Sequence, residues 1–535
     1  MNYSFIALFA VTASASAQIV PAPQQLKLPD LEGVSGHIIH LQAPEFSSQM
    51  DAFVAALQSL GVSNARYTED PAAQAVITFA KMDGLLPEAY MIQGSPGQLH
   101  VMAATPAGAA HATASLLQTV TVENGRATWP RMILLDMPDL PYRSFMIDMG
   151  RNPHAPATLR QVVDMMWMYK ANYLHLHLSD DQLFSWPSQA FPKLYSARAG
   201  WTWEDFVALE SYAQARGVTL IPEIDVPGHS TILRREYPDV FGVSSADLAT
   251  SPAAQQGVET LLTELLSVFK ATPYVHLGGD EAGGVPADDQ RDFINRLNEF
   301  LKSKGKRTLV WEGPALGEGK HKVAEDVIQM NWHTVGFPAQ EMLNAGYQIV
   351  NASWDPLYIV DHYPQTMFTA VDVERCYAWD LQRFAQVDPG ISTFLQPHHT
   401  RSATGILGFC MPWWEGREEN LLPLCLPRLA AVASAAWNRK GENDFEDFQK
   451  RQAATLPLLE KMAGIKLPQT PFATAQSQQD NLAFRATVTP SGGAAQPHFG
   501  PERLTNGLTD PFDHFLGFPT APQPLEILIQ LAAPA

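Results

Sequence analysis

Eight short apolar stretches, each followed by a helical pattern, constrain the fold of this chain more than any other feature. They carry few polar positions, as expected for parallel strands that are covered on both faces. Eight such units within about 270 residues suit closure into a barrel; a doubly wound sheet shows the same alternation and is the alternative. We therefore predict an α/β protein with a (β/α)8 TIM-type barrel, whose strands are residues 145–149, 173–179, 219–224, 274–277, 308–311, 327–331, 348–352 and 405–411.

The chain is long enough for several domains. With 535 residues, 46% of them hydrophobic and 17% charged, it has the composition of a globular protein with a large core. Residues 18–138 alternate short β-like runs with helical patterns, which predicts a small α/β domain ahead of a barrel at 139–465. A Pro- and Gln-rich linker follows at 466–480, and 481–535 form a further segment with a predicted strand at 525–531.

Charge and hydropathy limit the partners and the location of the protein. Its 36 basic and 55 acidic residues give a formal net charge of -19, which repels phosphate and anionic lipid and argues against nucleic acid as a partner. The apolar residues 5–11, followed by Ala15-Ser16-Ala17, predict a secretory signal at 1–17, with a buried N-terminal strand as the alternative. We recognise no later apolar run of the roughly 18 residues that span a bilayer. We therefore expect an exported protein, periplasmic or secreted, and the Ala-rich leader favours a bacterial source.

Three cysteines, Cys376, Cys410 and Cys425, are too few for a disulfide scaffold and lack the spacing of a zinc site. We expect them to be buried small apolar residues. One disulfide among them is the alternative in an oxidising compartment, although a core of this size would not depend on it.

The fourth apolar stretch ends in two glycines and two adjacent carboxylates, Gly278-Gly279-Asp280-Glu281. Successive side chains of a strand point to opposite faces, so neighbouring acids can serve one site only where the strand leaves its sheet and the glycines let the backbone turn. This is a strand end, where α/β enzymes keep their sites. The first turn of a helix, which acidic residues also favour, is the alternative.

Polar and aromatic side chains also follow the other predicted strands, as in a barrel enzyme. Acids with one His, one Arg and several Trp suit a neutral sugar whose reaction passes through a cation, because carboxylates stabilise such a centre and indole rings pack on sugar C–H surfaces. Taken singly, a Trp could pack in the core, His229 could be structural and Arg151 could pair with Asp148. The residues at the strand ends are Arg151, Asp180, Asp181, Asp225, His229, Trp311, Trp332, Tyr358, Trp414 and Glu415.

A metal site is a competing interpretation of four of these residues, Asp180, Asp181, Asp225 and His229. Carboxylates and imidazoles are common ligands, but the chain has no close helical His pair and no EF-hand loop to support such a site. We expect neither a metal nor another cofactor.

Four segments occur along the chain in a familiar order: Asp148-Met149-Gly150-Arg151, His175-Leu176-His177-Leu178-Ser179-Asp180-Asp181, Pro222-Glu223-Ile224-Asp225-Val226-Pro227-Gly228-His229 and His276-Leu277-Gly278-Gly279-Asp280-Glu281. Together they resemble glycoside hydrolase family 20, the β-N-acetylhexosaminidases, and the resemblance runs from about residue 20 to 465. It implies an exo-acting enzyme that removes terminal β-GlcNAc or GalNAc from glycans or chito-oligosaccharides. The segment before the barrel also looks like the small N-terminal domain of that family.

The resemblance implies a retaining, substrate-assisted reaction, in which the 2-acetamido oxygen of the sugar attacks C1 and the enzyme supplies no covalent nucleophile. By similarity, Glu281 is the general acid and later the base for water. Asp280 accepts from the acetamido N–H and stabilises the oxazolinium charge. Like charges this close raise one pKa, so we expect the two carboxyls to titrate as a coupled pair.

The same resemblance implies the sugar-binding residues. Arg151 would hold hydroxyls of the terminal sugar, and Asp180 with His229 would form a polar network beside Glu281. Trp311, Trp332 and Trp414 would wall the acetamido pocket, Tyr358 would donate to the acetamido oxygen, and Glu415 would bind the 4- and 6-hydroxyls.

Three positions depart from the family pattern; the first two bear on which sugars fit, and the third bears on the role implied for Tyr358. Gln182-Leu183-Phe184 stand where the family has a Gly-Trp pair, Asn152 replaces the His that usually follows the Arg, and Val360 stands where an acid or amide follows the Tyr. A lacto-N-biosidase or a sulfo-GlcNAc-specific relative is therefore an alternative function. A non-catalytic glycan-binding protein is a further one, although such a protein would usually have lost one of the two acids.

Residues 481–535 faintly resemble the start of a discoidin-like carbohydrate-binding sandwich. A truncated or degraded binding domain and a disordered extension are both consistent with this segment.

Overall fold

A computed structural model of the chain describes residues 18–29, 31–313, 319–332, 338–360, 373–385, 387–388, 393–394, 397–439, 441, 444–465, 487–490 and 527–530. The predicted signal at 1–17 and the predicted linker at 466–480 lie outside these residues. Strands β24 (Thr487–Pro490) and β25 (Ile527–Gln530) form an antiparallel pair, so the strand predicted at 525–531 is present.

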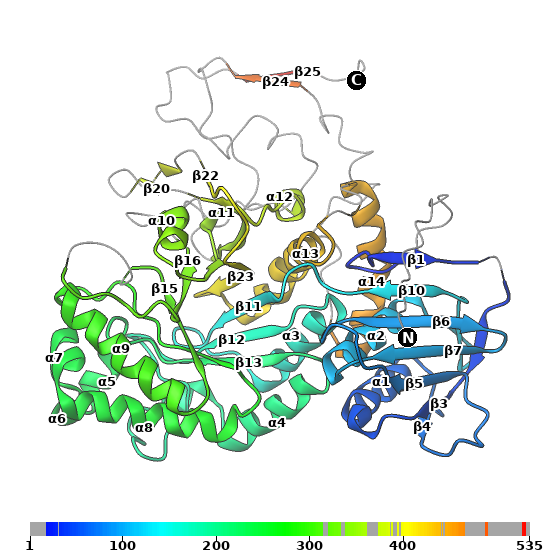
Figure 1. The fold of residues 1–535 in the computed structure, drawn as a ribbon, viewed down its shortest axis with the longest axis horizontal. Coiled ribbons are helices and arrows are strands. Elements are labelled where there is room, and N and C mark those ends of the chain that lie inside the picture. The colour runs from blue at the N-terminus through cyan, green and yellow to red at the C-terminus, as the bar shows by residue number, and fades with distance from the viewer. Residues whose placement is uncertain are drawn as a thin grey trace.

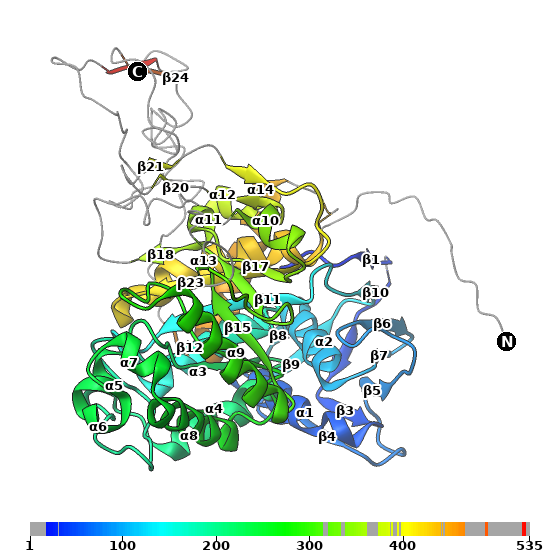
Figure 2. The same ribbon diagram turned by 60° about the vertical axis from the view of Figure 1, so that its left-hand side comes forward.

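The N-terminal part of the described chain is a mixed sheet covered on one face by two helices. Its seven strands lie in the order β1-β10-β6-β7-β5-β3-β4. Helix α2 packs on β6 and β7 and also on α3 of the neighbouring barrel, so it lies between the two parts (Figures 1 and 2). The elements are β1 (Gln25–Lys27), β3 (Ile38–Leu41), α1 (Ser47–Ser59), β4 (Arg66–Thr68), β5 (Ile77–Lys81), β6 (Tyr90–Ser95), β7 (Gln98–Ala103), α2 (Pro106–Thr119) and β10 (Ile133–Asp136), with a small sheet of β2 (Val34–Gly36), β8 (Thr121–Glu123) and β9 (Arg126–Trp129).

Eight parallel strands close into a barrel, because β11 pairs with β12 on one side and with β23 on the other. The predicted (β/α)8 fold is confirmed, and the doubly wound sheet is wrong. The prediction ended the last strand at residue 411, but β23 runs on to Trp414, since Pro412 continues the ladder where a proline suggests an end. The strands are β11 (Tyr142–Asp148), β12 (Tyr173–His177), β13 (Thr219–Glu223), β14 (Tyr274–His276), β15 (Arg307–Trp311), β16 (Ile328–Asn331), β17 (Ile349–Asn351) and β23 (Ile406–Trp414).

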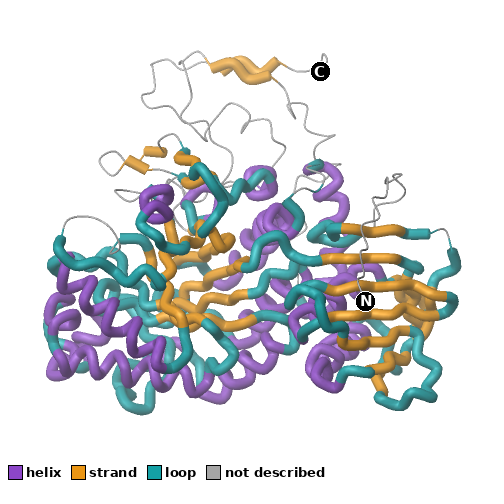
Figure 3. The backbone as a smooth tube through the Cα atoms, viewed as in Figure 1, coloured by secondary structure: helices purple, strands orange, loops and turns teal. Residues whose placement is uncertain are grey.

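Helices surround this barrel (Figure 3). Helix α4 shows how the sequence sets their ends: Thr202 and Asp205 form a reciprocal capping box at its start. The helices are α3 (Pro156–Met168), α4 (Trp203–Gln214), α5 (Thr231–Glu236), α6 (Pro238–Phe241), α7 (Ser245–Thr250), α8 (Pro252–Val268), α9 (Ala287–Ser303), α10 (Ala339–Asn344), α11 (Trp354–Leu357), α12 (Val373–Tyr377), α13 (Glu418–Trp437) and α14 (Phe445–Ala463). A short strand, β18 (Ile359–Val360), pairs with the end of β23.

Helix α13 differs from the sequence prediction, because by length and composition alone it could cross a membrane. In its most apolar stretch, 78% of the residues are buried inside the protein. The packing of this helix against the barrel accounts for its apolar composition. The three cysteines are buried and free, as expected, so the disulfide alternative is wrong.

Buried ion pairs join the N-terminal part to the barrel. The Lys170 ammonium lies 2.9 Å from Asp136 Oδ2, at the end of β10, and Arg143 Nη1 lies 2.8 Å from Glu88 Oε2. Lys170 and Arg143 are both fully buried. A buried charge without its partner is costly, so these pairs tie the stability of each part to the other.

Candidate active site

The carboxyl ends of the eight parallel strands bring all the predicted site residues to one end of the barrel. Asp280 and Glu281 lie just beyond β14. The others follow or end the remaining strands: Arg151 after β11, Asp180 after β12, Asp225 and His229 after β13, Trp311 at the end of β15, Trp332 after β16, Tyr358 just before β18, and Trp414 and Glu415 at the end of β23.

The turn that carries the two acids depends on its first glycine. Gly278 has φ +68°, and a Cβ there would overlap Asp225 Oδ1, so no other residue fits. The Trp311 N–H donates to the carbonyl of Gly278 at 2.8 Å, which keeps the turn attached to β15. Helix α9 begins only at Ala287, so Asp280 and Glu281 are at a strand end and the helix alternative is wrong.

Three non-glycine residues of the site have left-handed backbone conformations: His229 at φ +40°, Glu281 at φ +48° and Glu415 at φ +54°. Such conformations cost on the order of 1–3 kcal/mol each and persist only where the surroundings impose them. They come from three different loops and meet at one end of the barrel, which marks this end as the functional one.

A line of alternating charges runs across the site to Glu281. Arg151 Nη2 lies 2.7 Å from Asp180 Oδ2, and Asp180 Oδ1 lies 3.4 Å from His229 Nδ1. His229 Nε2 in turn lies 3.2 Å from Glu281 Oε2. Burial alone would lower the pKa of His229, but its bonds to the two carboxylates raise it to about 12. His229 is therefore an imidazolium that links a buried carboxylate to the exposed Glu281, whose side chain is 59% accessible.

Arg151 is fixed by several partners at once. It pairs with Asp148 at 3.0 Å, approaches Glu415 Oε1 at 3.8 Å and lies over the ring of Trp414 with 5.1 Å between guanidinium carbon and ring centroid. The pairing with Asp148 that the sequence offered as an alternative is present, together with the pairing to Asp180. With 17% of its side chain exposed, Arg151 is held in place by these contacts and still faces the open end of the barrel.

Asp280 lies beside a second carboxyl, Asp225, which the sequence had placed at a strand end without a role in the reaction. Burial raises the pKa of Asp280 to about 7, opposed by the charge of His229 and assisted by that of Glu281. Burial and the charge of Asp280 raise the pKa of Asp225 well above its usual range. Asp280 Oδ1 is buried and accepts no hydrogen bond from the described residues. This carboxyl is therefore poorly solvated as an anion and would be stabilised by a donor or a positive charge beside it.

Aromatic rings stand together beside these charged residues. The ring centroids of Trp311 and Trp414 are 5.6 Å apart, and Tyr358 lies 6.1 Å from Trp414 and stacks on Trp332 at 5.8 Å. Burial and the charge of Asp280 raise the pKa of Tyr358 well above its usual range. Trp354 also follows the seventh predicted strand but was given no role from the sequence; it packs on Trp332 at 5.6 Å between centroids.

Several acid and histidine groups are close enough to hold a metal ion, among them Asp180-Asp181-His229 and Asp225-His229-Asp280. In the first group Asp180 already accepts from Arg151 and His229, and Asp181 accepts from the Thr231 N–H at 2.9 Å. Contacts within the chain thus explain the arrangement of this first group. The expectation of a metal-free site stays a prediction.

Comparison with known proteins decides the family. The model of the glycosyl hydrolase family 20 catalytic domain matches residues 140–292 and 285–440, and that of the family's domain 2 matches residues 16–137. The chain belongs to glycosyl hydrolase family 20. It is therefore a glycoside hydrolase, and curated relatives agree: it is 27% identical over 422 residues to a β-hexosaminidase of Akkermansia muciniphila (68% of this chain, 82% of the relative) and 26% identical over 428 residues to a β-N-acetylhexosaminidase of Cellulomonas fimi (74% and 84%).

Solved structures of the family share the fold. A β-N-acetylhexosaminidase from Bacteroides fragilis superposes with a TM-score of 0.71 at 23% identity, covering 84% of this chain and 96% of the other. The N-acetyl-β-hexosaminidase of Streptomyces plicatus gives a TM-score of 0.71 at 22% identity, covering 86% and 98%.

The departures from the family pattern occupy defined places. Asn152 donates to the carbonyl of Glu415 and accepts from Arg198 at 3.2 Å, so it fixes the loop that carries Glu415. The Asp180 N–H donates to the Leu183 carbonyl at 3.0 Å, which folds the segment after β12 back on itself. Phe184 is fully buried. Val360, in β18, is 6% exposed.

The sequence prediction gave no role to Glu223, the last residue of β13. It is fully buried beneath the site, and Trp311 Nε1 donates to it at 2.8 Å. A carboxylate inside a barrel strand was the available signal, because an acid is almost never fully buried without partners.

Proposed function

We propose that this protein is an exo-acting, retaining β-N-acetylhexosaminidase that removes terminal GlcNAc or GalNAc from glycans or chito-oligosaccharides. The observation that carries the proposal is the glycine turn after β14, which presents Asp280 and Glu281 side by side, with Glu281 against the His229 imidazolium. The names of the curated relatives support this reaction.

In the proposed reaction the acetamido oxygen of the substrate attacks C1, and Glu281 gives its proton to the leaving oxygen. Glu281 then takes a proton from the water that opens the oxazolinium ion. The exposed side chain of Glu281 can reach both the leaving group and solvent. His229 and Asp180 orient it throughout, because one nitrogen of the imidazolium is held by Asp180 and the other contacts Glu281.

Asp280 accepts from the acetamido N–H in this proposal. Because the pKa of Asp280 is about 7, its anionic form is not strongly favoured in the free enzyme at neutral pH. A positive charge that develops on the acetamido group favours its anionic form, so the attraction is stronger in the transition state than in the ground state. This difference between the two states lowers the activation free energy of the reaction.

The remaining residues would bind the sugar. Arg151 and Glu415 would hold its hydroxyls, Trp311, Trp332 and Trp414 would enclose the acetamido group, and Tyr358 would donate to its oxygen. Their placement at one end of the barrel supports these roles.

The test is Glu281→Gln, assayed on nitrophenyl β-GlcNAc. Hydrolysis should fall by at least about 10³-fold while the circular dichroism spectrum stays that of the wild type. Glu236→Gln is the matched control: Glu236 is the last residue of α5, at the end of the helix that is further along the chain from His229, and it pairs with its neighbour Arg235, so that variant should stay active. Near-normal activity of Glu281→Gln would contradict the proposal.

A panel of nitrophenyl glycosides of GlcNAc, GalNAc, lacto-N-biose and 6-sulfo-GlcNAc tests the alternative specificities. Fastest turnover of the GlcNAc or the GalNAc glycoside supports the proposal. Turnover confined to lacto-N-biose or to 6-sulfo-GlcNAc would contradict it and support the corresponding alternative.

We also propose that the protein is exported after cleavage before Gln18, with an N-terminal domain at 18–138 and a catalytic domain at 139–465. The N-terminal sequence of the mature protein tests the cleavage site.

A further inference from the structure

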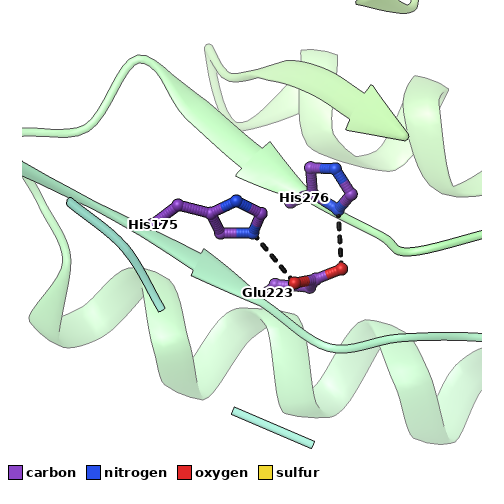
Figure 4. A group of neighbouring side chains, drawn as sticks. All are labelled: His175, Glu223 and His276. Carbon is purple, nitrogen blue, oxygen red and sulfur yellow. Dashed lines mark ion pairs between the residues drawn. The ribbon is translucent and has the colours of Figure 1, made fainter. Parts of the chain in front are cut away.

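Glu223 lies among four nitrogen atoms of neighbouring rings in the interior of the barrel, directly below the site. Its Oε2 lies 2.6 Å from His177 Nδ1 and 2.9 Å from His175 Nε2. Its Oε1 lies 2.9 Å from His276 Nδ1 and accepts from Trp311. Figure 4 shows Glu223 between His175 and His276. All these side chains are 0–1% exposed.

Strand register explains this cluster. Glu223 pairs with His177 of β12 on one side and with His276 of β14 on the other. Side chains two residues apart share a strand face, so His175 and His177 both point into the barrel with Glu223. A buried carboxylate without partners would cost several kcal/mol, and here each of its oxygens faces two nitrogen groups.

One of these partners continues toward the reaction. His177 reaches Glu223 with Nδ1 and Asp180 Oδ2 with Nε2, at 3.0 Å. Asp180 then contacts His229, and His229 contacts Glu281. An unbroken line of five side chains therefore joins a buried carboxylate to the exposed one, each contact lying between 2.6 and 3.4 Å.

We propose that Glu223 and His177 are positioning residues for acid catalysis: Glu223 holds His177, which holds Asp180, which orients His229 against Glu281. The inference rests on the proposed role of Glu281 as the general acid. Glu223 and His177 do not touch the substrate and act only through this line.

The charges of these side chains support the proposed sequence of contacts. Burial alone would lower the pKa of His177, but Glu223 and Asp180 raise it well above its usual range, so both ring nitrogens donate. Burial would raise the pKa of Glu223, but the surrounding histidines hold it well below its usual range. Asp148 and Asp225 also lie close to His177 and favour its charged form. Burial lowers the pKa of His175 to about 4, so this histidine is neutral and outside the line of charges.

Removing the Glu223 charge should leave His177 without its anchor in the core. Asp180 would then contact a His177 ring that Glu223 no longer holds in place. His229 would in turn no longer be fixed against Glu281. Acid catalysis should suffer, whereas sugar binding by Arg151 should persist through Asp148. A purely structural role would instead reduce the rate for every substrate equally.

The test compares kcat/KM on two substrates that differ in leaving group. Phenyl β-GlcNAc has a poor leaving group and needs the general acid, whereas dinitrophenyl β-GlcNAc leaves without protonation. Glu223→Gln should lose about 10²-fold on the phenyl substrate and less than about fivefold on the dinitrophenyl substrate. His177→Gln should show the same selectivity. His175→Gln is the control, since it removes another Glu223 partner outside the line, and it should affect both substrates in equal proportion.

Equal losses on both substrates in Glu223→Gln and His177→Gln, or no loss, would overturn the inference. Failure of the proposed function looks different: the wild type would not cleave phenyl β-GlcNAc, or Glu281→Gln would show no leaving-group selectivity. If the buried variants do not fold, histidine ¹⁵N spectra of the wild type decide. At about pH 8, above the ordinary histidine pKa of about 6.5, two doubly protonated histidines, His177 and His229, support the inference. A neutral His177 overturns it.

Discussion

Asp280→Asn should stabilise the folded protein at alkaline pH while it abolishes activity. Burial raises the pKa of this carboxyl from an ordinary 3.8 to about 7. The folded state therefore binds this proton more tightly than the unfolded state does, and stability is lost as the pH rises through about 7. Each pKa unit corresponds to about 1.4 kcal/mol, so ionised Asp280 lowers the free energy of unfolding by up to about 4 kcal/mol. An asparagine has no charge to bury and avoids this cost.

The assay is the thermal unfolding midpoint of Asp280→Asn and wild type, measured at one scan rate from about pH 4 to pH 8. The difference between the two midpoints should be near zero at about pH 4 and should grow to at least about 2 °C in favour of the variant at pH 8. Asp180→Asn is the matched control with the opposite sign. Its carboxyl is held well below its usual pKa by His177, His229 and Arg151, so its loss should destabilise the protein at pH 8. A variant Asp280→Asn that is less stable than wild type at pH 8, or a difference that does not depend on pH, would refute the reasoning.

Three further substitutions test the scaffold and the site. Gly278→Ala should give little folded protein, because its Cβ overlaps Asp225 and its backbone is left-handed; a soluble, active variant would contradict this. Lys170→Gln leaves Asp136 buried without its cation and should lower the free energy of unfolding in urea by about 3–5 kcal/mol, with a single transition for both parts of the chain; an unchanged midpoint would show that the pair does not join them. Tyr358→Phe removes the proposed donor to the acetamido oxygen and should lower kcat/KM on nitrophenyl β-GlcNAc by about 10²-fold, and a loss below about threefold would exclude that role.

The sequence predicted the barrel because its strands are apolar on both faces and bounded by polar residues. The turn at Gly278 was also predictable, because glycines at the end of an apolar run allow left-handed backbone conformations that let the chain turn there. The end of β23 was not predictable. A proline normally ends a strand, but Pro412 stays in the sheet and pairs with Met146.

The cluster around Glu223 could not be predicted from the sequence. Alternation places His175 and His177 on one face of a strand, but not which residue of the next strand lies opposite. That depends on the register of β12 and β13, which pairs His177 with Glu223. The proximity of Asp225 to Asp280 arises in the same way, from loops of two strands that meet only in the folded barrel.

The central claim is that the substrate's own acetamide is the nucleophile and that Asp280 assists it. The most direct measurement is kcat/KM of the wild type on nitrophenyl β-GlcNAc whose N-acetyl group carries zero, one, two or three fluorines. Fluorine withdraws electrons from the amide oxygen and weakens it as a nucleophile without removing the group that binds. We predict that kcat/KM falls with each added fluorine. Rates that do not respond to fluorine would contradict the account.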